Sequence, residues 1–260
     1  MAGVSIEQSG AVATLVIENA GRRNAISADL WQAFEPLLGQ LEADASVTVL
    51  IVRGAGEDFS AGADIGELDR ILHTSTGRDG GYLTEAENAF ARFPKPTIAA
   101  IDGYCVGGGW ELAAACDIRI ASSRATFGVT PSRIGIVYPL SGIERLVSIA
   151  GPAVAKYLLF SGDLVSAATA ERWGMVSSVV DAAELWSEAA SLAHRLSERS
   201  QLSIHAMKQI VDALDSNGEA AAVNRHWQGE VAQSDDPAIG AAAFVAKRRP
   251  GFTWAPRSRD

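Results

Sequence analysis

The sequence has few of the residues that build disulfide or metal frameworks. Only two of its 260 residues are cysteines, Cys105 and Cys116, and they neither form a CxxC pair nor accompany a histidine cluster. Both lie in apolar stretches, which indicates buried, reduced thiols. The histidines are scattered along the chain without metal-ligand spacing: His73, His194, His205 and His226. We therefore expect no disulfide framework and no metal site.

Long apolar runs and an excess of basic residues are also missing. No apolar stretch approaches the roughly 18 residues of a membrane helix, and the N-terminus lacks the basic segment of a signal peptide. The formal net charge is -9. Such a charge disfavours nucleic-acid binding, and any phosphate-bearing ligand would need a local basic patch. The sequence predicts a protein of a reducing, cytosol-like compartment with no nucleic-acid or membrane partner.

Three common motifs of nucleotide-binding proteins and hydrolases are absent as well. No Gly-Lys-Ser/Thr follows a glycine-rich loop, which excludes a P-loop. The lack of GxGxxG gives no support to a dinucleotide fold, and the lack of GxSxG argues against an α/β-hydrolase.

The residues that are present predict an α/β core with a helical C-terminal region. Hydrophobic residues make up 48% of the chain, enough for a large core. Residues 47–52 and 97–101 are continuous apolar runs, typical of strands covered on both faces. Nearly everything from residue 182 onward has a helical pattern.

Local signals add detail to this outline. The first 20 residues alternate apolar with polar and predict two strands around Ser9-Gly10. Ser27 is a suitable N-cap for a helix over residues 28–43, in which Pro36 predicts a kink or a break. Residues 69–84 are charged and polar, so we expect them to be mobile before a helix over residues 85–92.

Two glycine-rich loops each follow a buried strand and precede a helix. The first, FSAGADIGEL at residues 59–68, and the second, residues 103–109, both place N–H groups at a helix N-terminus. If the loops meet in space, one N–H from each could hold a single oxygen, which is an oxyanion hole made only of backbone. The alternative is that both are merely tight strand-to-helix turns.

Four segments together resemble the crotonase superfamily, also called the enoyl-CoA hydratase/isomerase family: FSAGADIGEL, FPKPTIAAIDGYCVGGGWELAAACDIRIAS, FGVTPSRIGI and FVAKRRPGF. The resemblance spans nearly the whole chain in the same order. It implies a spiral of ββα units over residues 1–200, which binds acyl-CoA, and a helical trimerisation region over residues 201–260. It also implies a homotrimer or a dimer of trimers. Coenzyme A would be part of the substrate, with no tightly bound cofactor, and the chemistry would stabilise a thioester enolate.

The resemblance also implies a set of site residues. The N–H groups of Ala63 and Gly108 would form the oxyanion hole. The residues that would contact coenzyme A are Arg22, Arg23, Ala61, Asp64 and Ile65, together with Phe244 and Lys247 from a neighbouring subunit. For the arginines and Lys247, solvated surface charge is an equally good interpretation.

Glu111 follows the second loop, where the family carries one of the two catalytic glutamates of hydratases. A helix N-terminus stabilises its anion, whereas burial in an apolar helix favours its protonated form. These opposed effects suit a general acid/base. The alternative is a glutamate that only caps the helix.

The second glutamate of the hydratase pattern is missing, because Pro131 occupies its place. The segment TPSRIGIVYPLSG instead resembles the methylmalonyl-CoA decarboxylase branch, in which Tyr138 could hold or release a departing carboxylate while Glu111 assists reprotonation. That branch can carry histidine where this chain has Ala63. Hydratase/isomerase-type activity and decarboxylation therefore both stand, and Tyr138 could also simply pack in a turn.

A catalytically idle or RNA-binding member of the superfamily is the interpretation from a different class. Single-strand RNA binding would favour a basic helix with aromatic side chains. The first predicted helix, residues 28–43, is acidic, which argues against RNA.

Overall fold

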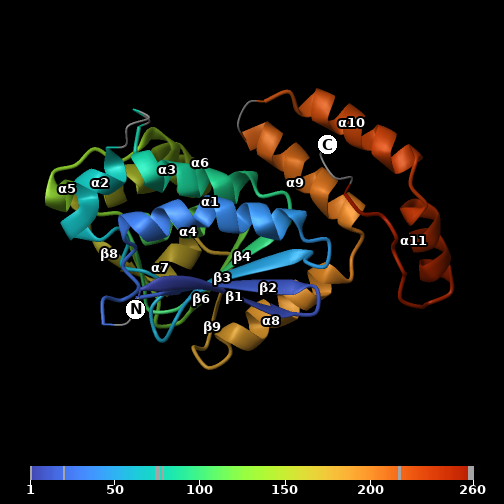
Figure 1. Cartoon of the computed structure of the whole chain (residues 1–260), viewed down its shortest axis with the longest axis horizontal. Coiled ribbons are helices and arrows are strands. Elements are labelled where there is room, and N and C mark those ends of the chain that lie inside the picture. Colours follow the sequence, from blue (N-terminus) through green and yellow to red (C-terminus); the bar gives the residue numbers. More distant parts are fainter. Residues whose placement is uncertain (1, 20, 74–76, 78, 216–217, 257–260) are drawn as a thin grey trace.

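A computed structural model describes residues 2–19, 21–73, 77, 79–215 and 218–256. These residues form two sheets and a set of helices, shown in Figure 1. The larger sheet has the strand order β1-β2-β3-β4-β6-β9, and the smaller one has the order β5-β7-β8. The α/β class that the sequence predicts is confirmed.

The larger sheet begins with an antiparallel hairpin and continues with parallel strands. β1 (Gly3–Ser9) and β2 (Val12–Glu18) form the hairpin that the sequence predicts around Ser9-Gly10. The parallel strands that follow are β3 (Val49–Gly54), β4 (Thr97–Ile101), β6 (Ile118–Ser122) and β9 (Ser178–Val180). The smaller sheet consists of β5 (Tyr104–Val106), β7 (Thr126–Gly128) and β8 (Leu164–Ser166).

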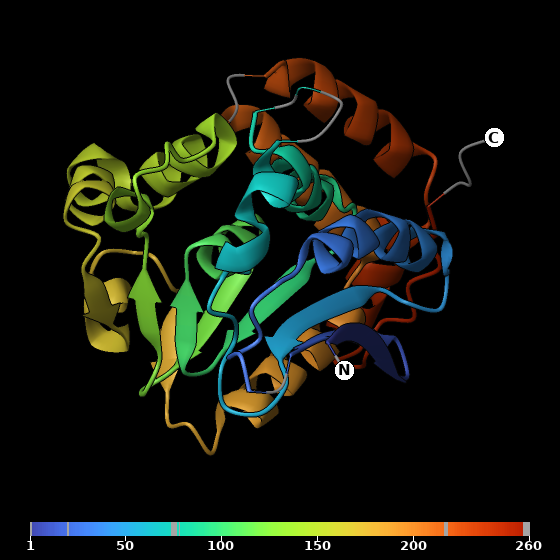
Figure 2. The same cartoon turned by 60° about the vertical axis from the view of Figure 1, so that its left-hand side comes forward.

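Helices cover the larger sheet on both faces, as Figures 1 and 2 show. α1 (Ala28–Ala43) and α4 (Gly108–Ala115) pack on one face, and α8 (Leu185–Ser197) packs on the other. Every residue of β4 is buried between these layers, which explains its uninterrupted apolar sequence.

The first helix has the bounds that the sequence predicts, but Pro36 does not break it. The Ser27 hydroxyl accepts a hydrogen bond from the Leu30 N–H at 3.3 Å, as an N-cap does. The helix continues through Pro36 because buried Phe34 and Leu38 anchor it before and after. Pro36 is exposed, so water can bond the carbonyl that the missing N–H leaves free.

The segment over residues 69–84, predicted to be mobile, is helical at both ends. The 3₁₀ turn η1 (Ile65–Glu67) leads into α2 (Leu68–Leu72), and α3 (Gly81–Arg92) begins four residues before the predicted start. A Cβ on Gly81 would lie 2.3 Å from the Ile71 carbonyl oxygen, so α2 and α3 pack closely at this point. Residues 74–76 and 78 lie outside the described residues.

The remaining helices complete the chain. They are α5 (Pro131–Ile134), α6 (Leu140–Ser161), α7 (Ala167–Arg172), α9 (Gln201–Asp215), α10 (Ala220–Ala232) and α11 (Asp236–Val245). α6 bends at Gly151, whose φ of 78° is not helical. None of the described helices is long and apolar enough to span a membrane.

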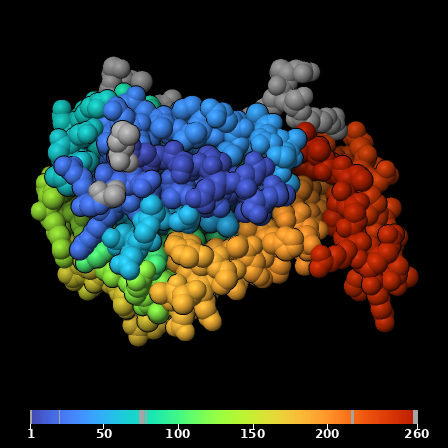
Figure 3. Space-filling view, turned by 60° about the horizontal axis from the view of Figure 1, so that its bottom comes forward, coloured from blue at the N-terminus to red at the C-terminus, as the bar shows by residue number. Residues whose placement is uncertain are grey.

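The last three helices extend away from the sheets, as Figures 1 and 3 show. They have an apolar cluster of their own around Leu202, Ala206 and Trp227, with Trp254 packed against it. Buried Asp236 ties the chain end to this cluster, because its carboxylate accepts hydrogen bonds from the Ser200 hydroxyl at 2.6 Å and the Thr253 N–H at 3.0 Å.

His205 of α9 should make the stability of the protein depend on pH. It is buried against the Trp254 ring. Burial, with the charges of Lys95 and Lys208, lowers the pKa of His205 from 6.5 to about 4. Between these values the unfolded chain binds a proton that the folded chain does not. The free energy of unfolding should therefore fall by up to about 3 kcal/mol as the pH drops from the upper to the lower value.

Urea unfolding at neutral pH and at pH values down to the lower one measures this effect. His205→Gln should remove that part of the pH dependence. His194→Gln, which changes a histidine side chain that is 69% exposed, should leave it unchanged. Identical pH dependence in the two variants would contradict the prediction.

Candidate active site

The two glycine-rich loops lie side by side. The Ser60 N–H donates to the Tyr104 carbonyl at 2.8 Å, and the Val106 N–H donates to the Ser60 carbonyl at 3.0 Å. A Cβ on Gly62 would stand 2.6 Å from the Val106 oxygen and 2.9 Å from the Gly108 nitrogen. The absence of a side chain at Gly62 therefore lets the loops approach at this point.

Two backbone N–H groups at this contact have no protein acceptor. Ala63 forms a parallel bridge with Ile26, in which Ile26 donates to the Gly62 carbonyl at 2.8 Å and Asp64 donates to the Ile26 carbonyl at 2.9 Å. Because successive N–H groups of an extended segment point to opposite sides, the Ala63 N–H faces away from Ile26. Gly108 is the first residue of α4, so its N–H has no partner within the helix. Across the part of the chain that the structure describes, neither N–H donates a hydrogen bond.

These two donors are near neighbours at a helix N-terminus. A Cβ on Gly108 would lie 3.3 Å from the Ala63 nitrogen. Gly107, at the N-cap of α4, has φ 55° and ψ -122°, a conformation open to glycine. The N-terminal end of α4 adds the positive end of the helix dipole. The arrangement can therefore stabilise negative charge on an oxygen placed between the loops.

The carboxyl group of Glu111 lies on the first turn of α4, next to these donors in the chain. The residue is 1% exposed, and neither carboxyl oxygen has a hydrogen-bond partner among the described residues. A Cβ on Gly142, near the start of α6, would lie 2.4 Å from the Glu111 Oε1 atom. The carboxyl is thus packed closely against backbone and is not paired.

Tyr138 approaches the same carboxyl from the segment that precedes α6. It is buried, and its hydroxyl has no hydrogen-bond partner of normal geometry among the described residues. Its ring lies beside Gly142, because a Cβ there would be 3.4 Å from the Tyr138 Cδ1 atom. Two polar groups that the sequence singles out therefore lie close together, buried and without a hydrogen-bond partner of normal geometry among the described residues.

The surroundings of Glu111 favour its protonated form. Burial raises the pKa of Glu111 well above its usual value, and the nearby charge of Glu87 raises it further. The Arg145 guanidinium and the Tyr138 hydroxyl lower it by less. Burial also raises the pKa of Tyr138, which keeps the phenol neutral. A carboxylic acid of this kind can give a proton to a bound molecule.

The sequence did not indicate Glu87, the second buried carboxyl of this region. It lies on α3 within the stripe of Leu83, Ala86 and Phe90 that faces the core. An acid at a core-facing helical position is the signal that could have revealed it. Pro131, by contrast, is the buried first residue of α5 and brings no titratable group.

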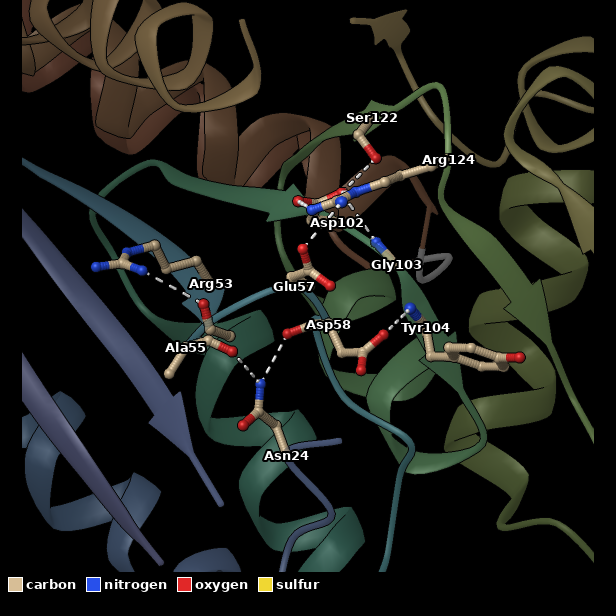
Figure 4. Close-up of polar contacts among 11 residues, drawn as sticks. Asn24, Arg53, Ala55, Glu57, Asp58, Asp102, Gly103, Tyr104, Ser122 and Arg124 are labelled. Atoms are coloured by element: carbon tan, nitrogen blue, oxygen red, sulfur yellow. Dashed lines mark hydrogen bonds and ion pairs between the residues drawn. The ribbon is translucent and has the colours of Figure 1, made fainter. Parts of the chain in front are cut away.

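Asn24 holds the first loop in place (Figure 4). It is buried in the left-handed conformation with φ 55°. Its side-chain amide donates to the carbonyls of Ala55 at 2.9 Å and Asp58 at 2.7 Å. The Asp58 carboxylate in turn accepts from the Tyr104 N–H at 2.9 Å, so the chain leaving β3 is fastened to β5.

A second polar cluster fixes the chain where it leaves β4. The buried Asp102 carboxylate accepts hydrogen bonds from Arg124 Nη2 at 2.6 Å and the Ser122 hydroxyl at 2.6 Å (Figure 4). Burial alone would raise the pKa of Asp102, but these hydrogen bonds outweigh burial and lower it. The two networks together hold both loops at fixed positions.

The candidate contacts to coenzyme A on the first loop lie around the Ala63 bridge. Ala61 donates its N–H to the Arg23 carbonyl at 2.8 Å. Arg22 pairs with Asp64 at 2.5 Å, and the Arg23 guanidinium lies 4.1 Å from the centre of the Tyr104 ring. Ile65 is 62% exposed beside them. The structure therefore brings these five residues together at the edge of the loop.

Phe244 and Lys247 lie elsewhere. Phe244 belongs to α11 and is 84% exposed, and Lys247 follows that helix. In Figure 1, α11 lies on the opposite side of the molecule from α2 and α5. Within one chain these two residues therefore lie apart from the loops.

A groove of about 1410 Å³ lies apart from these residues. It separates α9 from α1, α3 and the C-terminal end of α4, and its lining includes Lys208 and Arg145 but neither of the loops. We place the candidate site at the loops because the unpaired donors and the unpaired acid are there.

Comparisons with known proteins show which family the chain is similar to. The profile of the Enoyl-CoA hydratase/isomerase family matches residues 7–255. A short-chain-enoyl-CoA hydratase of Clostridium acetobutylicum is 34% identical over 255 residues, covering 95% of each chain. A crotonyl-CoA hydratase of Syntrophomonas wolfei is 31% identical, covering 96% of this chain and 97% of its own. A crystal structure of an enoyl-CoA hydratase/isomerase family member superposes with a TM-score of 0.93 at 39% identity, covering 99% of this chain and 100% of the other.

The chain belongs to the enoyl-CoA hydratase/isomerase family, that is, the crotonase superfamily. The family and the crotonase-type fold that the sequence predicts are both confirmed. The relatives are named as hydratases, so the predicted class of a lyase or isomerase is confirmed as well.

Proposed function

We propose that the chain converts an acyl-CoA thioester in the manner of an enoyl-CoA hydratase or isomerase. The N–H groups of Ala63 and Gly108 hold the thioester oxygen, and Glu111 transfers the proton. Coenzyme A is part of the substrate. Residues 1–200 form the catalytic core in this proposal, and residues 201–260 form the oligomerisation region.

The observation that supports this most directly is the pair of unpaired N–H groups. A thioester enolate places full negative charge on one oxygen, and two preorganised donors in a dry site stabilise it more than water does. The oxygen must touch backbone, and Gly62 and Gly108 have no side chains to block it. The unpaired carboxyl of Glu111 then lies one helical turn from the donors.

The proton chemistry depends on how many acids the site holds. Isomerisation of a double bond needs one carboxyl, which removes a proton from one carbon and returns it to another. Hydration also needs a group that orients the attacking water, and Pro131 cannot do this. The proposed role of Glu111 therefore fits isomerisation once this carboxyl is ionised, and fits hydration only if another group holds the water.

The nucleotide end of the substrate is proposed to lie at the edge of the first loop. Ala61, Asp64 and Ile65 line that path, and Arg22 and Arg23 supply the basic patch that an acidic protein needs for phosphates. Phe244 and Lys247 would come from a neighbouring copy in a homotrimer or a dimer of trimers. Their position far from the loops of their own chain supports this part of the proposal.

Decarboxylation of a malonyl-type thioester is the second candidate, and the Tyr138–Glu111 contact favours it. The bond from the α-carbon to the carboxylate breaks, CO₂ leaves, and the electron pair becomes the enolate held by the two N–H groups. Protonated Glu111 then gives its proton to the α-carbon. This reaction needs no water-orienting acid, and the unpaired Tyr138 hydroxyl can bond the departing carboxylate.

Assays of the purified protein with crotonyl-CoA and with methylmalonyl-CoA separate the two candidates. Loss of the enoyl absorbance without CO₂ release supports hydratase or isomerase activity and excludes decarboxylation. CO₂ release without enoyl loss has the opposite meaning. If calorimetry detects no binding of either thioester at millimolar concentration, both proposals fall and an idle or RNA-binding protein is left.

Tyr138→Phe tests the decarboxylation proposal, because it removes only the hydroxyl group of the side chain. We expect kcat for methylmalonyl-CoA to fall by roughly 10²-fold, because the group that orients the carboxylate for departure is lost. The melting temperature should not fall, since the hydroxyl that is removed has no protein partner. An unchanged kcat for CO₂ release would show that Tyr138 only packs in its turn.

A further inference from the structure

Glu87 is a fully buried carboxyl that the proposed reaction does not use. It lies on α3 with 0% of its surface exposed. An isolated carboxylate in such a place would be strongly unfavourable, so its partners must explain its presence. Those partners all belong to the beginning of α6.

Two groups on α6 bond the Glu87 carboxyl. Arg145 Nη1 lies 3.0 Å from Glu87 Oε2, and the Ser141 hydroxyl donates to Glu87 Oε1. Gly142, between these two residues, is the one packed against the carboxyl of Glu111. One turn of α6 therefore separates two buried carboxyls that approach it from α3 and α4.

The charges of this cluster allow only one buried carboxylate to be neutralised. Arg145, with a side chain that is 19% exposed, is the one cation that faces both carboxyls among the described residues. Glu87 has the direct ion pair and a hydroxyl donor. Glu111 has no direct ion pair among the described residues, and the Tyr138 hydroxyl beside it is neutral. The negative charge therefore belongs on Glu87 and the proton on Glu111.

We propose that Glu87 is a positioning residue that, together with Arg145, holds the proton on Glu111 until substrate is bound. The catalytic meaning of this role rests on the function proposed for Glu111. Pro131 occupies the place of the second glutamate of hydratases. In this chain the second negative charge near Glu111 is supplied by Glu87 on α3. Glu87 itself does not touch the substrate.

The electrostatics of the cluster agree with a negative charge on Glu87 and a proton on Glu111. Burial raises the pKa of both carboxyls, and for Glu111 the charge of Glu87 is the next largest cause. The groups that face Glu111 are Glu87 on α3, Arg145 on α6 and the Tyr138 hydroxyl. Asp79 adds a negative charge on the side of Glu87.

Infrared titration of the whole protein with ¹³C-carboxyl glutamate tests the proposal without any substrate. Wild type should show a protonated carboxyl band at neutral pH that is lost in Glu111→Gln, which assigns the band. In Glu87→Gln the midpoint of this band should fall by about one pH unit or more, because a like charge is removed and Arg145 is released toward Glu111. The limb of the kcat–pH profile that reports the ionisation of Glu111 should move in the same direction.

Glu85→Gln is the matched control, since it removes the same charge from the same helix and should leave the midpoint of the Glu111 band in place. Should Glu87→Gln fail to fold, Glu87→Asp keeps the carboxylate but shortens the side chain by one methylene, which moves the charge away from α6. It should then shift the midpoint in the same direction by a smaller amount.

Two results would overturn the proposal. One is the absence of a protonated Glu111 band at neutral pH in wild type. The other is a midpoint that stays the same in the Glu87 variants. If the band behaves as expected but no thioester is turned over, the function proposed for Glu111 fails while the charge arrangement stands.

Discussion

Glu111→Gln is expected to lower kcat by roughly 10²–10⁴-fold, the range that a positioned general acid/base contributes. The amide has nearly the shape of the carboxyl but cannot give or take the proton. Binding of the acyl-CoA should persist, because the loops that hold the thioester oxygen are untouched. The loss should therefore appear in kcat more than in the dissociation constant that calorimetry measures.

The same variant should be about as stable as wild type. Glu111 is a buried carboxyl without a hydrogen-bond partner among the described residues, and such a group costs stability. The amide is neutral and nearly the same shape, as the protonated acid is, so the melting temperature should change little. Stability lost at an active site in this way is a common feature of enzymes.

Glu144→Gln, the same substitution at an exposed position of α6, is the control and should keep wild-type kcat. Wild-type turnover in Glu111→Gln would exclude this residue as the acid/base. A large fall in melting temperature would instead assign it a structural role.

Gly62→Ala is the second change with a large expected effect. Its added Cβ would meet the backbone of the second loop, at 2.6 Å from the Val106 oxygen and 2.9 Å from the Gly108 nitrogen. The φ of 95° is also unfavourable for alanine. The two loops must therefore separate, which moves the Ala63 and Gly108 donors apart.

We expect kcat to fall by roughly 10²–10³-fold, as when one oxyanion donor is lost. The free energy of unfolding should fall by about 1–3 kcal/mol because of the strained backbone. Steady-state kinetics on the substrate that the assay identifies, together with urea unfolding, measure both changes.

Gly39→Ala is the matched control. Gly39 is an exposed residue of α1 with open space where its Cβ would stand. Alanine there should keep full activity and raise helix stability by about 0.5–1 kcal/mol. If Gly62→Ala folded and kept wild-type kcat, the loop contact would have no part in catalysis.

Much of the frame that carries the site could be predicted from local sequence. β4 (Thr97–Ile101) has the predicted bounds because a strand covered on both faces is apolar throughout. α1 begins at the predicted residue because Ser27 caps its N-terminus. An oxyanion hole required the two glycine-rich loops to meet in space, and in the structure they meet at Gly62.

What sequence could not predict depends on residues far apart in the chain. Arg145 lies 58 positions after Glu87, so no local pattern links them. The approach of Gly142 to Glu111 likewise follows from how α6 packs on α4. The break predicted as one possibility at Pro36 does not occur, since a local rule about helix interiors was outweighed by the buried side chains on either side.

The backbone of Ser60 bonds to both sides of Cys105, so a parallel bridge joins the first loop to β5. A second parallel bridge, between Ala63 and Ile26, holds the Ala63 amide in place. A ligand oxygen arriving there would find dipoles already aligned. The reorientation that liquid water requires around a new charge is then largely complete when the chain has folded.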